Sequence, residues 1–145
     1  MSIEYKEGFE DSYFESILDV YTELGWTNYT SEPHDLKKAL ENSTYIVLAF
    51  SSDKLVGLAR SISDEISIHY LQDILVSPKF QKKGIGRGLM DLVLARFSNV
   101  RTHMILTDNE LRQRKFYESL GYKNLSDLKK IPLNSYVKMN GVELS

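Results

Sequence analysis

The 145-residue chain contains no cysteine, one tryptophan and three prolines. Without cysteine it forms no disulfide, holds no thiolate-bound metal and uses no cysteine nucleophile. Hydrophobic residues make up 42% of the chain, but no run approaches the roughly 20 apolar residues that cross a bilayer. The acidic start, MSIEYKEGFEDSYFESIL, also lacks the apolar core of a signal peptide. We therefore expect a soluble, unexported, cytoplasmic protein that does not enter a membrane.

Positive and negative side chains are also nearly balanced in the chain. The chain has 18 Lys and Arg against 20 Asp and Glu, a formal net charge of -2, so no overall field attracts nucleic acid or an anionic membrane. The basic stretch Arg112–Lys115 is expected to be a solvated helix face. His34, His69 and His103 have no metal-ligand spacing. We predict no nucleic-acid partner, no membrane partner and no metal, and a homodimer is compatible with the sequence.

Hydrophobic periodicity and turn residues predict the order β-α-α-β-β-β-α-β-α-β, a mixed α/β domain over residues 1–145. Short polar turns separate three β-rich segments, 44–50, 54–62 and 66–76, which predicts an antiparallel meander. A late strand is expected at Asn134–Met139. The other expected elements are a strand near Ile3–Tyr5, helices over Asp11–Leu24, from Pro33, over Gly84–Phe97 and over Asn109–Leu120, and a strand over Thr102–Thr107.

The most informative stretch is ILVSPKFQKKGIGRGLM, residues 74–90. It runs from an apolar strand through a basic turn into alternating glycines at the start of a helix. Unpaired main-chain N–H groups and the helix dipole make such a helix start a phosphate site. Glycine at 84 and 86 allows close approach of a phosphate, and Lys82, Lys83 and Arg87 add positive charge. The spacing fits neither a Walker loop nor the dinucleotide fingerprint.

The segment Gln81–Gly86, QKKGIG, resembles the Q/R-x-x-G-x-G/A signature of the GNAT superfamily of N-acetyltransferases. LQDILVSPKFQKKGIGRGLM is similar to that family's fourth strand and third helix, and NELRQRKFYESLGY to its following helix. The resemblance covers nearly the whole chain. It implies a GNAT-type acyl-CoA N-acyltransferase fold, with a central mixed, mostly antiparallel sheet flanked by helices. It also implies transfer of an acetyl group from acetyl-CoA (coenzyme A) to a primary amine by direct attack in a ternary complex, without a metal.

The resemblance further implies which residues bind the cosubstrate. Main-chain amides of the loop and helix start hold the pyrophosphate, and main-chain groups of the preceding strand bind the pantetheine arm. The Val76 N–H is the candidate that polarises the thioester carbonyl. Asn109 is either a helix N-cap or a pantetheine ligand. The cofactor-binding candidates are Ile74, Leu75, Val76, Gln81, Lys82, Lys83, Gly84, Ile85, Gly86, Arg87, Gly88 and Asn109.

Tyr117, in the Phe-Tyr pair of that motif, is the candidate general acid. A positioned phenol can protonate the thiolate that leaves when the tetrahedral intermediate collapses. The alternative is a half-buried tyrosine whose hydroxyl bonds a main-chain group.

The candidate catalytic base lies at Gln72 or Asp73, where spermidine/spermine-type relatives carry a Glu-Asp pair. Here the first acid is an amide; if Gln72 is the residue that faces the active site, a water chain or no enzymic base is expected. Because side chains alternate along a strand, Gln72 and Asp73 are expected to point to opposite faces. The alternative for Asp73 is a structural carboxylate bonded to a neighbouring loop.

Two aromatic residues, Trp26 and Tyr29, lie in the loop ELGWTNYTSE and are the candidate substrate-binding residues. The alternative for Trp26 is a plug of the core beneath the loop. A small-molecule amine is the expected acceptor, although the sequence does not separate polyamine, amino acid, aminoglycoside and protein amines. The alternative function is an acetyl-CoA-binding regulatory module without turnover.

Overall fold

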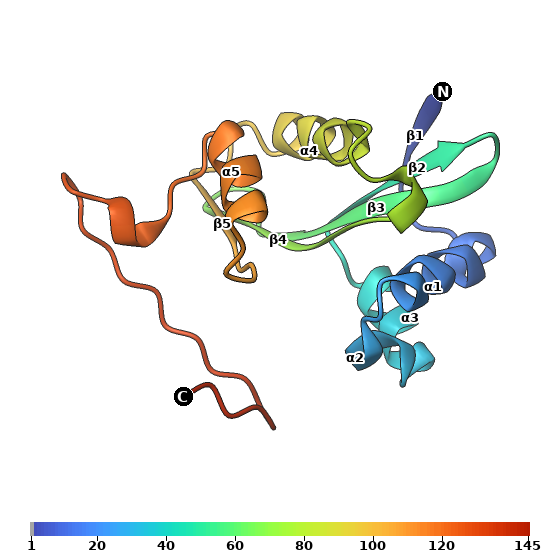
Figure 1. The fold of residues 1–145 in the computed structure, drawn as a ribbon, viewed down its shortest axis with the longest axis horizontal. Coiled ribbons are helices and arrows are strands. Elements are labelled where there is room, and N and C mark those ends of the chain that lie inside the picture. The colour runs from blue at the N-terminus through green and yellow to red at the C-terminus, as the bar shows by residue number, and fades with distance from the viewer. Residues whose placement is uncertain (1) are drawn as a thin grey trace. The chain divides into compact units, whose positions relative to one another are not determined.

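The computed structural model describes residues 2–145, which form two compact units divided between Leu106 and Thr107. The first unit holds a five-stranded sheet and most of the helices, and the second holds one α-helix and the C-terminal segment (Figure 1). The fold class predicted from the sequence, a mixed α/β fold with helices flanking the sheet, is confirmed. The assignment of residues 1–145 to a single domain stays a prediction.

The sheet has the strand order β1-β2-β3-β4-β5. All neighbours pair antiparallel except β4 and β5, which pair in parallel. The predicted antiparallel meander of β2, β3 and β4 is therefore confirmed. The strands are β1 (Ile3–Glu7), β2 (Tyr45–Ser51), β3 (Lys54–Ser63), β4 (Ile68–Val76) and β5 (Thr102–Ile105).

Helices cover both faces of this sheet, with α1, α2 and α3 on one face and α4 on the other (Figure 1). Pro33 begins α3, as its fixed φ favours. The short α2 forms where the sequence predicted only a loop. The helices are the 3₁₀ turn η1 (Asp11–Tyr13), α1 (Phe14–Glu23), α2 (Thr27–Thr30), α3 (Pro33–Glu41), the 3₁₀ turn η2 (Pro78–Phe80) and α4 (Ile85–Arg96).

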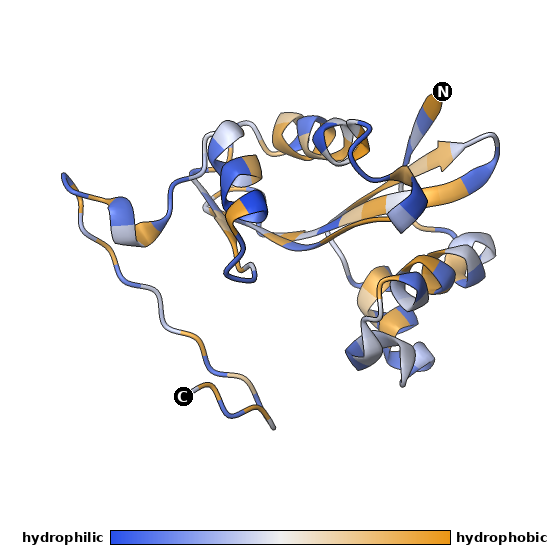
Figure 2. Cartoon of the chain, viewed as in Figure 1, coloured by the Kyte–Doolittle hydropathy of each residue, from blue (hydrophilic) through white to orange (hydrophobic). Residues whose placement is uncertain are grey.

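Hydrophobic residues lie along the strands and along one side of the helices that pack on the sheet (Figure 2). One core cluster joins α1 and α3 to β2, β3 and β4, with Ile17, Tyr21 and Leu58 fully buried. On the other face, α4 buries an apolar stripe that includes Leu89 and Val93. Both faces of the central strands are thus covered, which explains why β2 is an almost unbroken apolar run.

The second unit contains α5 (Leu111–Ser119) and the 3₁₀ turn η3 (Leu125–Asp127). The strand predicted at Asn134–Met139 is wrong, because these residues have no strand structure and are exposed. Tyr136, for example, is 92% exposed. The segment contains the strand-favouring residues Tyr136 and Val137, but residues 107–145 include no strand for it to pair with. Among residues 2–145, no helix has the length and apolar character needed to cross a membrane.

Candidate active site

A β-bulge interrupts β4 at Gln72. In the pairing with β3, Arg60 lies opposite Asp73 and the next residue, Ser61, lies opposite Leu71, so Gln72 is the extra residue. A bulge inserts one residue without a partner and changes which face the following side chains meet. On one side of it, His69 stacks on Phe97 at the end of α4. On the other side, Asp73 accepts a hydrogen bond from Tyr21 of α1.

The expectation that Gln72 and Asp73 point to opposite faces is therefore wrong. Regular alternation fails at the bulge, and both side chains reach the same hydroxyl on the α1–α3 side of the sheet. The Tyr29 hydroxyl donates to Asp73 Oδ1 at 3.1 Å, and Gln72 Nε2 donates to the Tyr29 hydroxyl at 3.4 Å. The bulge gathers these residues around Tyr29.

Asp73 is a buried carboxylate, 4% exposed, whose oxygens are occupied by protein groups. Nε and Nη2 of Arg60 each lie 2.9 Å from Oδ2, and the Tyr21 hydroxyl donates to the same oxygen at 2.8 Å. Burial, the largest single effect, lowers the pKa of Arg60, but the charge of Asp73, the two neighbouring tyrosines and the hydrogen bond to Asp73 together raise that pKa above its usual value. Burial, followed by the Asp73 charge, raises the pKa of Tyr21 well above its usual value. Asp73 and Arg60 thus form an ion pair with both tyrosines protonated at neutral pH.

The α2 segment is held over β4 by Tyr29 and Trp26. Their rings stack with centroids 6.1 Å apart and planes 26° apart, and both rings also contact Tyr21. Trp26 packs against the core cluster while staying partly exposed, which agrees with the core-plug alternative; its substrate-binding role stays a prediction. Burial, and then the Asp73 charge, raise the pKa of Tyr29. The α2 segment therefore places two aromatic rings beside β4, near the exposed Gln72 amide of that strand.

The far end of β4 has an unpaired edge. β5 pairs with β4 only from Ile68 to Leu71, so the strands separate beyond that point. The Ser77 N–H donates to Val56 of β3 at 2.7 Å, and by antiparallel alternation the main-chain groups of Ile74 and Val76 point away from β3. Gln81 Nε2 donates to the Val76 carbonyl oxygen at 3.0 Å. The Ile74 and Val76 N–H groups thus face the side on which β5 has ended.

The loop between β4 and α4 turns sharply. Lys82 and Gly84 have φ values of 63° and 85°, and Gly84 is the N-cap of α4 without a side-chain cap hydrogen bond. Main-chain turns of this kind direct successive N–H groups toward one concave side, a typical anion-binding arrangement. Ile85 anchors the helix start because its side chain is 1% exposed in the core. The loop therefore has the features that the phosphate hypothesis requires.

Close packing against β1 explains why position 88 is a glycine. A Cβ at this position would lie 2.1 Å from the hydroxyl oxygen of Tyr5 in β1. The close approach of β1 to α4 accounts for this glycine without any ligand.

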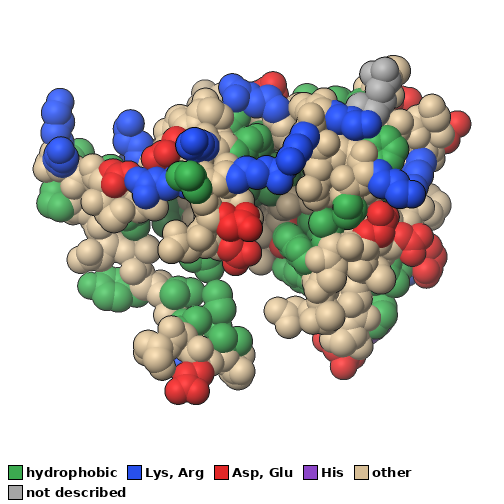
Figure 3. All heavy atoms as spheres, in the orientation of Figure 1, with side chains coloured by type: hydrophobic (Ala, Val, Ile, Leu, Met, Phe, Trp, Pro, Cys, Tyr) green, Lys and Arg blue, Asp and Glu red, His purple; other side chains and the backbone are tan. Residues whose placement is uncertain are grey.

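Exposed basic side chains surround the same loop. Lys82, Lys83 and Arg87 are exposed, and Arg87 lies 3.9 Å from Asp91. Figure 3 shows Lys and Arg side chains across the upper part of the molecule. In the same orientation, Figure 1 shows α4 in this upper part. The local positive charge suits a ligand with several phosphates.

In the second unit, Tyr117 is the buried residue of α5. Its ring contacts Phe116 and Tyr122, and burial, together with the nearby Tyr122, raises its pKa to about 12. The Tyr122 hydroxyl is buried without a hydrogen-bond partner among the described residues. Glu110, not Asn109, is the N-cap of α5, so the N-cap alternative for Asn109 is wrong.

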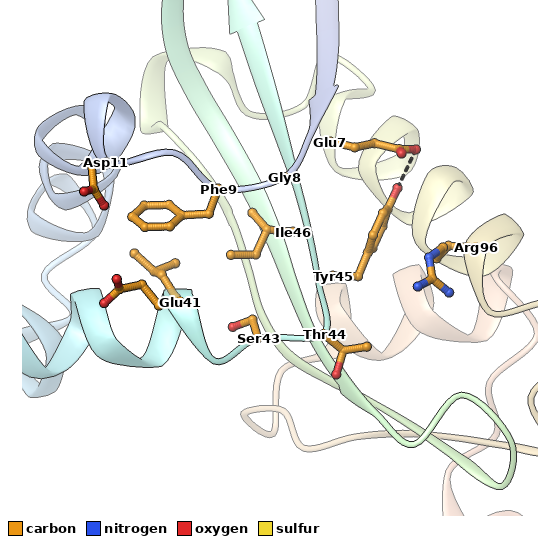
Figure 4. A pocket seen from close by; sticks show the side chains of 11 residues that line it. Glu7, Gly8, Phe9, Asp11, Glu41, Ser43, Thr44, Tyr45, Ile46 and Arg96 are labelled. Carbon is orange, nitrogen blue, oxygen red and sulfur yellow. Dashed lines mark hydrogen bonds between the residues drawn. The ribbon is translucent and has the colours of Figure 1, made fainter.

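A hollow of about 500 Å³ lies elsewhere in the first unit and contains none of the predicted site residues. Glu7, Asp11 and Glu41 line it together with Arg96 (Figure 4). Two of its carboxylates have partners: Glu7 accepts from the Tyr45 hydroxyl at 3.0 Å, and Asp11 lies 3.7 Å from Lys37. We place the candidate active site at β4 rather than here, because β4 combines open main-chain groups with a basic, glycine-rich helix start.

Sequence reasoning missed several residues of the site. Arg60 lies within an apolar strand, and a charge in such a run is itself a signal of a buried partner. Gly57 lies opposite Val76, where a Cβ would be 2.8 Å from the Leu75 carbonyl oxygen.

Within residues 2–145, no group of three or more His, Asp or Glu could hold a metal ion.

Known proteins resemble this chain in sequence and in fold. The acetyltransferase (GNAT) domain family matches residues 17–140. An uncharacterized ycf52-like N-acetyltransferase of Prochlorococcus marinus is 30% identical over 91 residues, which cover 60% of this chain and 51% of the relative. The chain thus spans about half the length of the curated relatives that it matches.

Solved structures extend the similarity to the whole fold. A GNAT family acetyltransferase from Streptococcus pneumoniae has a TM-score of 0.78 and 32% identity, over 92% of this chain and 98% of that one. An aminoglycoside N-acetyltransferase, AAC(6')-Iy in complex with CoA, shares the fold with a TM-score of 0.70 at 17% identity, over 94% of this chain and 95% of that one. The chain belongs to the GNAT acetyltransferase family.

Proposed function

We propose that the protein transfers an acetyl group from acetyl-CoA to the primary amine of a small molecule by direct attack in a ternary complex. The observation that carries the proposal is the unpaired edge of β4 leading into the basic loop at the start of α4. An edge of this kind accepts an extended, amide-containing ligand by main-chain hydrogen bonds, as an added strand does. The helix start beyond it suits phosphate. Pantetheine joined to a pyrophosphate has both parts in this order.

The cosubstrate is proposed to bind through main-chain groups at both ends. Ile74, Leu75 and Val76 would contact the pantetheine arm. The loop amides from Gln81 to Gly86 would hold the pyrophosphate, with Lys82, Lys83 and Arg87 adding charge. Gly88 would contribute by bringing the helix close to β1, and Asn109 is retained as a pantetheine ligand. The CoA complex of the aminoglycoside N-acetyltransferase with the same fold supports this assignment.

The chemistry follows from these groups. The amine nitrogen attacks the thioester carbonyl carbon, and the Val76 N–H donates to the oxygen as negative charge develops there. When the carbon–sulfur bond breaks, Tyr117 is proposed to give its hydroxyl proton to the thiolate. A pKa of about 12 keeps this phenol protonated at neutral pH, so a donor proton is present when the thiolate forms.

The proton of the attacking amine is proposed to leave through water. Asp73 was a candidate base, but Arg60, Tyr21 and Tyr29 already bond its oxygens, which leaves it poorly suited to accept a proton. Gln72 has no basic group and is exposed, so it can hold a water molecule beside the amine. The cytoplasmic location and the small-molecule acceptor belong to the same proposal.

Release of free thiol from acetyl-CoA, measured with a panel of amines, tests this function. The panel contains 2-phenylethylamine, putrescine, lysine and an aminoglycoside, and turnover with at least one of them is expected. If the protein binds acetyl-CoA but no amine releases thiol, the non-catalytic binding module replaces the enzyme. Tyr117→Phe should lower the rate of the chemical step roughly 100- to 10,000-fold while the fold is kept. Tyr136→Phe, which removes an exposed hydroxyl, is the matched control.

A further inference from the structure

The hydrogen bonds of Tyr29 fix the direction of its hydroxyl group. A phenol has one proton to donate and two lone pairs to accept with. The proton goes to Asp73 Oδ1 at 3.1 Å. Arg60 Nη2 donates to the oxygen at 3.3 Å, and Gln72 Nε2 donates to it at 3.4 Å. Because Asp73 and Arg60 are buried and held in an ion pair, turning the hydroxyl proton away would remove the donor bonded to the buried Oδ1.

The third hydrogen-bond partner of Tyr29, Gln72, differs from Asp73 and Arg60 because it is exposed. It is the exposed bulge residue of β4, and its 3.4 Å hydrogen bond is longer than a usual N–H···O bond and therefore weak. Its amide can therefore be replaced by another N–H donor that arrives from the open side. Tyr29, which Gln72 contacts, stacks with the Trp26 ring, and the carboxylate bonded to Tyr29, Asp73, is paired with Arg60.

We propose that the acceptor amine replaces the Gln72 amide and donates one N–H to the Tyr29 hydroxyl oxygen, with its apolar part against the Trp26 and Tyr29 rings. This inference rests on the proposed function. A neutral primary amine that donates one N–H still has its lone pair free for attack on the thioester. Asp73 and Arg60 are then positioning residues that act through Tyr29. The favoured acceptor is a monoamine with an apolar body rather than a polycation.

Raised by burial and then by the Asp73 charge, the pKa of Tyr29 keeps the hydroxyl protonated over the neutral range. The proton therefore stays between Tyr29 and Asp73, and the oxygen offers only a lone pair to the ligand. Arg60 also lies over the Tyr29 ring, 5.8 Å from its centroid, which further restricts the ring.

Trp26 provides a readout that does not depend on turnover, because it is the single tryptophan of the chain and stacks on Tyr29. In the presence of CoA, 2-phenylethylamine should change its fluorescence saturably and should bind more tightly than putrescine. Tyr29→Phe keeps the ring and should weaken 2-phenylethylamine binding roughly three- to tenfold, as the loss of one hydrogen bond predicts. CoA affinity should stay the same, which shows that the variant is folded. Tyr13→Phe, a partly buried tyrosine that packs on Phe50, is the matched control and should bind like the wild type.

Equal amine affinity in wild type and Tyr29→Phe, or tighter binding of putrescine, overturns the inference, as does the absence of any fluorescence change. Amine binding without thiol release would instead refute the proposed function while leaving the Tyr29 contact intact. Asp73→Asn can turn an amide N–H toward Tyr29 and reverse the hydroxyl, so it should weaken amine binding to a similar degree and keep the pH profile of kcat. Loss of one limb of that profile with unchanged amine affinity would identify Asp73 as the base and contradict its positioning role.

Discussion

Replacing Arg60 with leucine should destabilise the fold far more than loss of a surface ion pair. Asp73 is 4% exposed and Arg60 is 5% exposed, so Arg60→Leu leaves a carboxylate in the interior without its counter-charge. Breaking a buried pair from one side typically costs about 3–5 kcal/mol. The Tyr21 and Tyr29 hydroxyls still donate to Asp73, so we expect the lower end, about 3 kcal/mol. That is a large part of the about 5–15 kcal/mol that stabilises a typical domain.

The double variant Arg60→Leu, Asp73→Asn isolates the charge effect. The asparagine oxygen still accepts from a tyrosine, but the neutral amide needs no counter-charge, so the double variant should be more stable than Arg60→Leu by roughly 1–2 kcal/mol. Urea unfolding followed by circular dichroism measures all free energies of unfolding. Lys37→Leu, which removes the exposed Lys37–Asp11 pair, is the control and should cost less than about 1 kcal/mol. If Arg60→Leu costs no more than this control, the buried pair does not hold the site as described.

Two further predictions concern the rest of the first unit. Burial, and then the charge of nearby His103, lower the pKa of His69 to about 4. Between about pH 6.5 and about pH 4 the unfolded chain therefore binds a proton at this histidine that the native state does not bind. The free energy of unfolding should fall by up to about 3 kcal/mol as the pH drops through this range. His69→Gln should remove this part of the pH dependence of thermal unfolding and the exposed His34→Asn should not; equal slopes in all three proteins would refute it. Gly88→Ala should destabilise the protein because its Cβ would overlap the Tyr5 hydroxyl, whereas in a Tyr5→Ala background it should stabilise by up to about 1 kcal/mol through helix propensity. Urea midpoints compare the two backgrounds, and the same sign of effect in both would contradict the packing explanation.

Much of the fold could be predicted because local and tertiary preferences agree in it. The apolar runs of β2, β3 and β4 predicted the antiparallel meander. The glycine-rich start of α4 led to the phosphate hypothesis. The bulge at Gln72 could not be predicted, because it results from the pairing of β4 with β3 and leaves no mark on the β4 pattern. Strand alternation therefore gave the wrong relation between Gln72 and Asp73.

The pairing of Arg60 with Asp73 was also out of reach, since it links two strands that only the folded sheet brings together. At the C-terminal end the opposite error occurred. Asn134–Met139 contains residues that favour strands, but residue preference alone does not make a strand without a neighbour to bond with. Tyr29 was predicted as a substrate residue from its aromatic character, and the hydrogen bonds that direct its hydroxyl became visible only in the fold.

The most direct test of the central claim is a calorimetric titration of acetyl-CoA into the wild type, Gly86→Val and Ala95→Val. Gly86 is the second residue of α4, where a valine side chain would obstruct a phosphate, and Ala95 is an exposed position near the other end of the same helix. The account predicts saturable binding to the wild type and to Ala95→Val, with at least roughly tenfold weaker binding to Gly86→Val. No binding to the wild type, or equal affinity in all three proteins, would contradict the assignment of acetyl-CoA to the β4 edge and the start of α4.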